Sequence, residues 1–351
     1  MTNYPRHLIS IADITTEYWD LLYSRCRDIM SRPKDYSDAA SDKIMASLFF
    51  EPSTRTQMSF QTAQLRLGGK LIGFSDPKMT SGAKGETLAD TMRMFSAYAD
   101  CIVMRNPYEG AALAASLYSD VPIINAGDGG HQHPTQTLTD LTTIAELRGE
   151  IGGLTVGICG DLKYGRTVHS LVSALINFPR INFVLISPPS LAMPEYITWL
   201  LDAKSVTWRT ESSIEAVLPE LDILYMTRIQ RERMGDGASI VYPPEMILTA
   251  EKMTRAKSDL CVMHPLPRVT EIEPAVDADP RAVYFRQARY GMFIRMALLL
   301  EKQNLPRERS RYYEAATARH CPNPVCITRT NPYLPDRRSP GGFCEYCDTK
   351  I

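Results

Sequence analysis

The sequence lacks a positively charged leader followed by an apolar segment, and it has no apolar run long enough to span a bilayer. It also lacks a basic excess, since 39 Lys and Arg residues stand against 40 Asp and Glu residues. These absences argue against a secreted or membrane protein and against a nucleic-acid-binding surface. We therefore expect a cytoplasmic protein whose partners include neither a membrane nor a nucleic acid.

Disulfide pairing is not indicated in the first 305 residues. Cys26, Cys101, Cys159 and Cys261 stand singly among apolar residues, a pattern typical of reduced, buried thiols. At 351 residues, the chain is long enough for two core-forming domains and a small appendage.

Apolar runs alternate with amphipathic segments through most of the chain, which predicts an α/β protein whose parallel sheets are covered by helices. Ser10–Asp13 resembles a capping box and predicts the start of the first helix. The predicted strands are 44–50, 71–74, 101–104, 121–124, 154–161 with its turn, 182–187, 222–227 and 261–264, and the later helices are 86–98, 111–119, 137–147, 166–178, 194–203 and 288–302.

A glycine-rich break at Gly149–Gly153 predicts the boundary between the two domains. We expect domains over residues 1–150 and 151–287 and a module over 306–351. The helix over 288–305 is expected to pack back onto the first domain.

The segment Ser53-Thr54-Arg55-Thr56 joins the first predicted strand to a helix that runs to about Leu67. Its side-chain oxygens can cap the helix, and the unpaired N–H groups of the first turn lie beside the cation Arg55. This combination predicts an anion site. An ordinary helix N-cap is the alternative, which this segment alone does not exclude.

Polar residues also follow the other strands of the first domain. The carboxyl ends of parallel strands meet at one edge of a sheet, so these residues predict a shared site. His133 and Gln136 are one helical turn apart and are expected to face the same way, although a lone histidine there is more often a cap or packing residue. The set comprises Ser81, Lys84, Arg105, His133 and Gln136.

The second domain repeats this pattern with arginines. Arg166, Arg228 with Gln230, and Arg268 each follow a predicted strand. Guanidinium groups match carboxylates bidentately, so three arginines on one rim predict a dicarboxylate ligand, with solvated surface arginines as the alternative. Gly157 and Gly160 give only a weak dinucleotide signal, because the third glycine of that fingerprint is displaced to Gly165.

Two close cysteine pairs near the C-terminus, Cys321 with Cys326 and Cys344 with Cys347, predict a structural Zn²⁺ site. The segment has almost no apolar core, so metal binding must supply much of its folding free energy. Unpaired cysteines in a disordered tail are the alternative.

In combination these motifs resemble the catalytic chain of aspartate carbamoyltransferase over Tyr4 to Leu305. The motifs that carry the resemblance are Ser53-Thr54-Arg55-Thr56, Lys84-Gly85-Glu86, His133-Pro134-Thr135-Gln136, Asp161-Leu162-Lys163-Tyr164-Gly165-Arg166 and His264-Pro265-Leu266-Pro267-Arg268.

The resemblance implies transfer of a carbamoyl group from carbamoyl phosphate to L-aspartate, in de novo pyrimidine biosynthesis, by a homotrimer that needs no metal for catalysis. Higher assembly stays open. It implies that carbamoyl phosphate is bound by Ser53, Thr54, Arg55, Thr56, Arg105, His133, Gln136, Leu266 and Pro267, with Arg55, Thr56, Arg105 and His133 catalytic. It implies aspartate binding by Lys84, Arg166, Arg228 and Gln230, with Ser81 and Lys84 reaching a neighbouring subunit's site.

Two alternative functions remain at this point. An ornithine carbamoyltransferase typically carries a cysteine after the histidine of the last strand, where this chain has Pro265. An inactive zinc-bearing scaffold is the alternative from another class. The cysteine-rich segment itself resembles the zinc domain of the aspartate carbamoyltransferase regulatory chain, without the nucleotide-binding domain that precedes it there.

Overall fold

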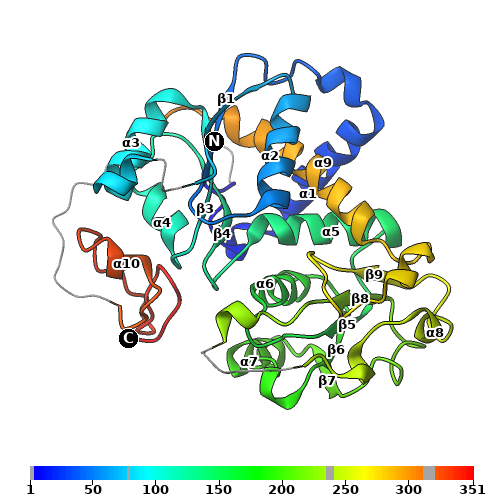
Figure 1. The fold of residues 1–351 in the computed structure, drawn as a ribbon. Coiled ribbons are helices and arrows are strands. Elements are labelled where there is room, and N and C mark those ends of the chain that lie inside the picture. Colours follow the sequence, from blue (N-terminus) through cyan, green and yellow to red (C-terminus); the bar gives the residue numbers. More distant parts are fainter. Residues whose placement is uncertain (1–3, 77–79, 235–240, 311–320) are drawn as a thin grey trace. The chain divides into compact units, whose positions relative to one another are not determined.

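The computed structural model describes residues 4–76, 80–234, 241–310 and 321–351 (Figure 1). The chain divides into two compact units: unit 1 comprises Met1–Thr135 with Met292–Ile351, and unit 2 comprises Gln136–Gly291. The division lies within two helices, α5 (Pro134–Arg148) and α9 (Tyr284–Gln303). The domain boundaries expected at Gly149–Gly153 and near residue 287 stay a prediction.

Unit 1 is built on a parallel four-stranded sheet in the order β2-β1-β3-β4. Ala46 of β1 belongs to the apolar cluster formed with α3 and α4. On the opposite face, Cys101 of β3 accepts a hydrogen bond from Gln303 of α9 at 3.4 Å. Both faces are therefore covered, which is the reason most side chains of the central strands β1 and β3 are buried. The strands are β1 (Ile44–Phe49), β2 (Lys70–Phe74), β3 (Cys101–Asn106) and β4 (Ile123–Asp128), and the other helices are α1 (Thr16–Ser31), α2 (Thr54–Arg66), α3 (Leu88–Tyr98) and α4 (Ala111–Ser116).

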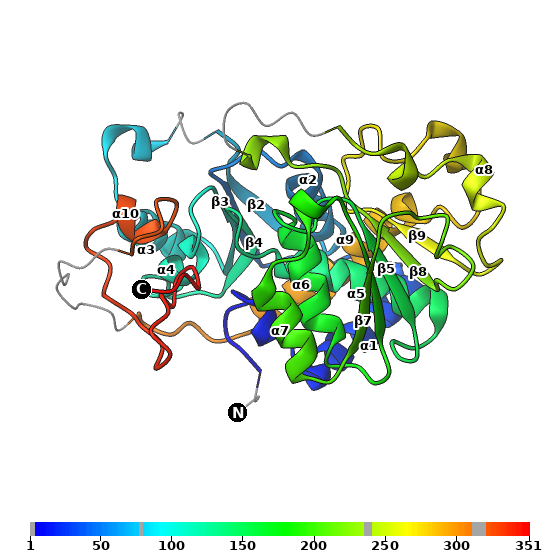
Figure 2. The same cartoon turned by 90° about the horizontal axis from the view of Figure 1, so that it is seen from below.

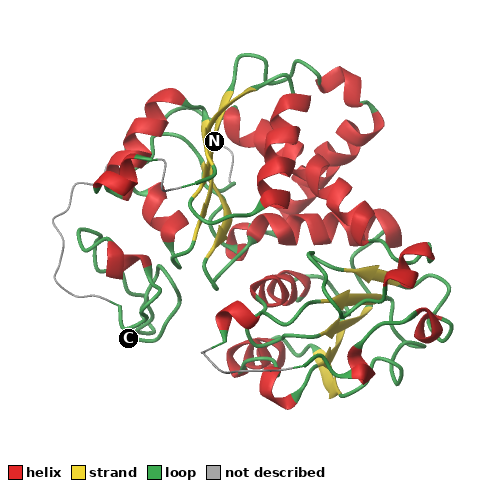
Figure 3. Ribbon diagram, in the orientation of Figure 1, coloured by secondary structure: helices red, strands yellow, loops and turns green. Residues whose placement is uncertain are grey.

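Unit 2 contains a parallel five-stranded sheet in the order β7-β6-β5-β8-β9. Figure 3 draws the strands in yellow and the helices in red. The sequence did not predict β7, because this edge strand is polar and largely exposed. The strands are β5 (Thr155–Cys159), β6 (Asn182–Ile186), β7 (Thr207–Glu211), β8 (Ile223–Met226) and β9 (Cys261–Met263), and the helices are α6 (Arg166–Leu175), α7 (Glu195–Ala203) and α8 (Ala250–Met253).

The N-terminal capping box is present but does not open the long helix. The Ser10 side chain accepts from Ala12 N–H, and Asp13 Oδ2 accepts from Ser10 N–H, around a 3-10 turn over Ile11–Asp13. Ile14 then leaves the helical conformation, and α1 starts afresh with Thr15 as its N-cap. The prediction that Ser10 starts the first long helix was therefore wrong, because that helix has its own N-cap at Thr15.

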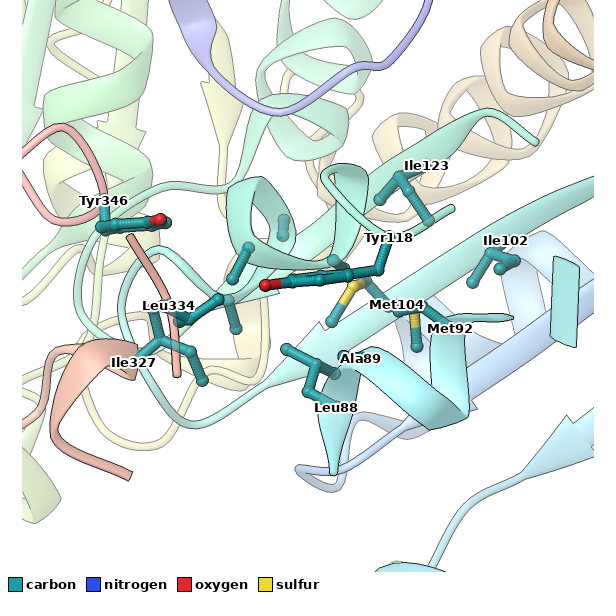
Figure 4. Close-up of a cluster of buried hydrophobic side chains, with 14 of the residues drawn as sticks. Leu88, Ala89, Met92, Ile102, Met104, Tyr118, Ile123, Ile327, Leu334 and Tyr346 are labelled. Carbon is teal, nitrogen blue, oxygen red and sulfur yellow. The ribbon is translucent and has the colours of Figure 1, made fainter. Parts of the chain in front are cut away.

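The C-terminal module, residues 321–351, belongs to unit 1 and packs on α3 and α4 (Figure 2). Ile327, Leu334 and Tyr346 of the module join one buried apolar cluster with Leu88 and Tyr118 (Figure 4). The module contains one short helix, α10 (Ile327–Thr330). The apolar core of the module is thus shared with the rest of unit 1.

The same contact is fixed by the backbone. Glu109 N–H donates to Val325 O at 2.9 Å, and Ile327 N–H donates to Glu109 O at 2.9 Å. Asn323 Nδ2 adds a hydrogen bond to the Glu109 carboxylate at 2.7 Å.

Among the described residues, no helix is both long and apolar enough to cross a membrane.

Candidate functional site

The turn between β1 and α2 carries the residues predicted to hold an anion. Ser53 occupies the N-cap position, but its side chain makes no cap hydrogen bond, contrary to the prediction. Its backbone is the reason: at φ −158° and ψ 83°, Ser53 is outside the conformation from which N-cap hydroxyls usually reach the helix N–H groups. Thr54 and Arg55 are exposed, whereas Thr56 is buried. The first turn of α2 therefore presents its N–H groups without the Ser53 oxygen, beside an exposed cation.

Arg105 lies in β3 near its carboxyl end, next to β1. Its Nε is 3.0 Å from Glu51 Oε2, and only 12% of its side chain is exposed. Phe50 N–H donates to Arg105 O at 2.8 Å, which ties the turn before α2 to β3. Burial lowers the pKa of Arg105, and the Glu51 carboxylate opposes this shift. The arrangement keeps a desolvated cation at the edge of the sheet, where an anion would gain most from it.

His133 follows a glycine-rich turn whose centre is the buried Asp128. Asp128 Oδ1 accepts from Gln132 N–H at 3.0 Å, and Oδ2 accepts from Gly110 N–H at 2.9 Å. The His133 side chain is buried, and Thr135 Oγ1 lies 3.5 Å from its Nδ1. Asp128 thus organises the turn that leads to His133, although the sequence analysis did not single it out.

The loop after β2 contains a 3-10 turn over Ser81–Lys84. Lys84 is exposed. The side chain of Ser81 lies outside the described part of the chain. The position of Lys84, after the second strand of the sheet, agrees with the sequence pattern.

In unit 2, Arg166 is the first residue of α6 and only 5% exposed. The preceding turn is organised by Asp161, which is fully buried and accepts from Tyr164 N–H at 2.9 Å and from Gln230 N–H at 3.0 Å. Gln230 Nε2 also donates to Tyr164 O at 3.0 Å. Asp161 therefore links the turn after β5, which carries Arg166, to the segment after β8, which carries Arg228 and Gln230.

Arg268 is engaged differently from the other two arginines. Its guanidinium pairs with both oxygens of Asp277 and donates to Tyr284 Oη at 2.9 Å. The Asp277 carboxylate raises the pKa of Arg268. The argument for a dicarboxylate ligand therefore depends on Arg166 and Arg228.

The glycines that gave the weak dinucleotide signal have packing roles. A Cβ added at Gly160, which has a φ of +123°, would lie 2.1 Å from Thr227 O. A Cβ at Gly157 would lie 2.5 Å from the Leu221 side chain. Both glycines permit close contact within unit 2, which explains them without a nucleotide.

Gln136 and the Leu266-Pro267 pair also belong to unit 2. Gln136, in the first turn of α5, donates from Nε2 to Asp140 Oδ1 at 2.8 Å. Leu266 precedes Pro267 through a cis peptide bond and has a φ of +57°, a conformation that leucine rarely adopts. Leu266 N–H donates to His264 Nδ1 at 2.7 Å, which holds it there.

The four cysteines of the module come together as predicted. Their sulfur atoms all lie within 4.8 Å of one another and are buried, with 3.6 Å between Cys321 and Cys347 and 3.9 Å between Cys326 and Cys344. A disulfide needs about 2.05 Å, whereas four sulfurs about 2.3 Å from a tetrahedral metal are about 3.8 Å apart. The donor set therefore fits a metal ion, and soft thiolates favour a zinc-type ion over a hard cation.

Comparison with known protein families settles the class of the chain. The model for the aspartate/ornithine carbamoyltransferase carbamoyl-P binding domain matches residues 6–146, and the model for the Asp/Orn binding domain matches residues 152–301. The chain belongs to the aspartate/ornithine carbamoyltransferase family.

Curated carbamoyltransferases and solved structures agree. The aspartate carbamoyltransferase catalytic subunit of Clostridium perfringens is 52% identical over 296 residues, which cover 84% of this chain and 96% of that protein. The catalytic subunit of M. jannaschii aspartate transcarbamoylase is 44% identical with a TM-score of 0.78, over 85% of this chain and 97% of that one. The Trypanosoma cruzi enzyme in complex with N-(phosphonacetyl)-L-aspartic acid is 38% identical with a TM-score of 0.80, over 85% and 95%.

The carbamoyltransferase family models end at residue 301, so the four-cysteine module lies outside them. Within the family region, the sequence pattern pointed to the charged residues at the strand ends. It did not point to the carboxylates that hydrogen-bond to the turns carrying those residues. A Gly-Asp pair at the end of β4 and after β5, Gly127-Asp128 and Gly160-Asp161, was a usable signal for two of these carboxylates.

Proposed function

We propose that this chain transfers the carbamoyl group of carbamoyl phosphate to the amino group of L-aspartate, giving N-carbamoyl-L-aspartate and phosphate, as a step of pyrimidine biosynthesis. The observation that carries the proposal is 52% identity, over 84% of the chain, to a curated aspartate carbamoyltransferase catalytic subunit. Membership of the family by itself leaves aspartate and ornithine as the two acceptors.

The residues of unit 1 supply the groups that this chemistry needs at carbamoyl phosphate. Ser53, Thr54, Arg55 and the first turn of α2 would bind the phosphate, because exposed N–H groups and a cation suit an anion. Thr56, Arg105 and His133 would polarise the carbamoyl oxygen as negative charge develops on it. Gln136, Leu266 and Pro267, all carried by unit 2, would bind the carbamoyl end.

The residues of unit 2 favour aspartate as the acceptor. Arg166 is buried at the start of α6, and Arg228 follows β8. The guanidinium groups of both would bind the carboxylates of aspartate. Gln230, with Lys84 from unit 1 of a neighbouring subunit, would complete the aspartate set. A diamino acid such as ornithine would place a second cation among these arginines, which is unfavourable. Pro265, in place of the cysteine typical of ornithine enzymes, supports the same choice.

The reaction needs no covalent nucleophile, because phosphate is already a good leaving group. The aspartate nitrogen attacks the acyl carbon, a C–N bond forms, and the C–O bond to phosphate breaks. The amine proton passes to the departing phosphate. The chain contributes orientation and charge stabilisation, each donor to the developing oxyanion lowering the barrier by about 3 kcal/mol.

The acceptor is tested by assaying the purified protein with carbamoyl phosphate and either L-aspartate or L-ornithine. We expect phosphate release with aspartate and none above background with ornithine. Activity with ornithine alone would overturn the assignment, and inactivity with both would favour the scaffold alternative.

We further propose that the metal of the module is Zn²⁺, held by Cys321, Cys326, Cys344 and Cys347, and that it stabilises the module without taking part in catalysis. The module would correspond to the zinc domain of a regulatory chain, fused here to the catalytic chain. The functional assembly would be a homotrimer in which Ser81 and Lys84 serve the neighbouring subunit's site.

A further inference from the structure

A buried network of polar side chains runs through unit 2 between two segments that the proposed function assigns to carbamoyl phosphate. One end is Gln136, in the first turn of α5, and the other is Leu266, which follows β9. The residues between them come from distant parts of the chain and are at most 1% exposed: Asp140, Gln287, His264 and Glu271.

The Leu266 end is fixed through His264. Its Nδ1 accepts from Leu266 N–H at 2.7 Å, so Nδ1 carries no proton. Its Nε2 therefore carries the proton and donates it to Glu271 Oε1 at 2.8 Å. Glu271 Oε2 accepts from the N–H groups of Val269 and Thr270 at 3.1 and 3.0 Å. The carboxylate thus selects the one tautomer of His264 that can hold Leu266.

The Gln136 end is fixed through Asp140. Asp140 Oδ1 accepts from Gln136 Nε2 at 2.8 Å and from Gln287 Nε2 at 2.7 Å, and Oδ2 accepts from Tyr225 Oη at 3.0 Å. Gln287 Oε1 in turn accepts from the backbone N–H of His264 at 3.0 Å. Gln287 therefore joins the two ends into one chain of hydrogen bonds.

This arrangement is costly unless every member is paired. Leaving a buried carboxylate or amide without its hydrogen-bond partner costs on the order of 1–3 kcal/mol of folding free energy. The arrangement in which every group is paired is therefore favoured over arrangements that break a hydrogen bond. Leu266 in particular is held in a left-handed conformation that its own side chain disfavours.

We propose that Glu271 and Asp140 are positioning residues for carbamoyl phosphate: Glu271 fixes Leu266 through His264, Asp140 fixes Gln136, and Gln287 couples the two. The inference rests on the proposed function, which makes Gln136 and Leu266 ligands of that substrate. Neither carboxylate needs to touch carbamoyl phosphate, because each acts by fixing the position of Gln136 or Leu266.

The test is Glu271→Gln, which keeps the size of the side chain. The glutamine oxygen accepts from the Val269 and Thr270 N–H groups, so its NH₂ faces His264 and demands an unprotonated Nε2. His264 then carries its proton on Nδ1, and two N–H donors face each other at Leu266. We expect the Kd for carbamoyl phosphate, measured by calorimetry, to rise about tenfold.

Two further readouts separate positioning from a general loss of stability. Nitrogen-15 spectra of the histidine rings should show His264 change from the Nε2–H to the Nδ1–H tautomer. The KM for carbamoyl phosphate should rise with its Kd, while the KM for aspartate changes much less. As a second variant, Gln287→Met should also weaken carbamoyl phosphate binding, because it removes both links at similar volume.

Asp222→Asn is the matched control. Asp222 is a part-buried carboxylate of the same unit that precedes β8, where it accepts from Thr155 N–H at 2.8 Å and pairs with Lys257. Its change should leave carbamoyl phosphate affinity unaltered. A changed His264 tautomer with unchanged affinity would overturn the inference alone, whereas failure of the parent protein to bind carbamoyl phosphate would overturn the proposed function as well.

Discussion

At the residue scale, His7 has a charge state that its surroundings determine. Its Nδ1 accepts from Ile123 N–H at 3.0 Å, beside the point where Leu8 pairs with β4. Burial, together with the nearby cations Arg6 and Lys302, lowers the pKa of His7 to about 3. The folded chain therefore keeps His7 neutral at pH values where an unfolded chain would protonate it.

Because the folded pKa is below the unfolded value of about 6.5, the stabilisation from His7 is complete above that value. It is lost as the pH falls toward 3, by up to about 1.4 kcal/mol for each pH unit. We expect the free energy of unfolding, measured with denaturant, to fall over this window more steeply in the parent than in His7→Asn. Parallel curves for the two proteins would contradict this account.

Single residues also show how far sequence reasoning reaches. Arg105, His133 and Arg166 were predicted as site residues because charged or polar residues at the ends of apolar strands are visible in a linear pattern. Glu271 gave no such signal. Its contact with His264 depends on how the segment after β9 packs, and a periodic sequence pattern does not reveal that packing. Arg268 satisfied the pattern, yet Asp277 binds its guanidinium group, and only coordinates reveal that partner.

At the element scale, the start of α4 lies close to the C-terminal module. Gly110 is the N-cap of α4 with a φ of +79°, and a Cβ there would lie 2.3 Å from Tyr346 O. Gly149 has a similar φ of +84°, but its Cβ would meet nothing within 4 Å. The two glycines therefore separate backbone strain from a steric clash.

We expect Gly149→Ala to destabilise the protein by about 1 kcal/mol, through strain alone. Gly110→Ala should cost clearly more and should also speed the release of metal to a chelator, because Tyr346 precedes the ligand Cys347. Calorimetric melting and a colorimetric metal-release assay measure the two effects. Equal losses from the two alanines, with equal metal release, would exclude the close contact as their cause.

The elements themselves were predictable where burial dominates. Strands such as β1 and β3 consist mostly of buried apolar residues and were placed to within about two residues, as is usual for boundaries. The edge strand β7 was missed because one exposed side removes the apolar signal. The contact of the module with α3 and α4 was also beyond sequence reasoning, since it depends on residues far apart in the chain.

At the scale of the whole molecule, the metal site and the core of unit 1 are one structure. Cys326 and Cys344 belong to the same buried cluster as Ile102 and Met104 of β3. Removing the metal with a chelator, or replacing Cys344 and Cys347 with serine, should therefore lower the melting temperature of the whole protein by at least about 5 °C. Cys261→Ser, outside the module, is the control. An unchanged melting temperature after loss of metal would refute this coupling.

The proposed trimer makes a separate prediction. Lys84 is exposed in the loop after β2. We assign Lys84 to a neighbour's site and Arg55 to the site of its own subunit. Mixing Lys84→Ala with Arg55→Ala subunits should restore about one quarter of the composite sites in random trimers. Phosphate release and mass in solution measure the outcome. Mixtures that exchange subunits but stay inactive would show that each subunit holds a complete site.

The order of synthesis gives the docked module a further consequence. The apolar face of α3 and α4, with Leu88 and Tyr118, is made roughly 200 residues before Ile327, Leu334 and Tyr346 cover it. At about 5–20 residues per second on the ribosome, that face stays open for roughly 10–40 s. A nascent chain therefore carries an uncovered apolar surface until its last segment emerges and folds onto it. If a metal ion is needed for that folding, shortage of the metal in the cell would first appear as aggregation of newly made protein.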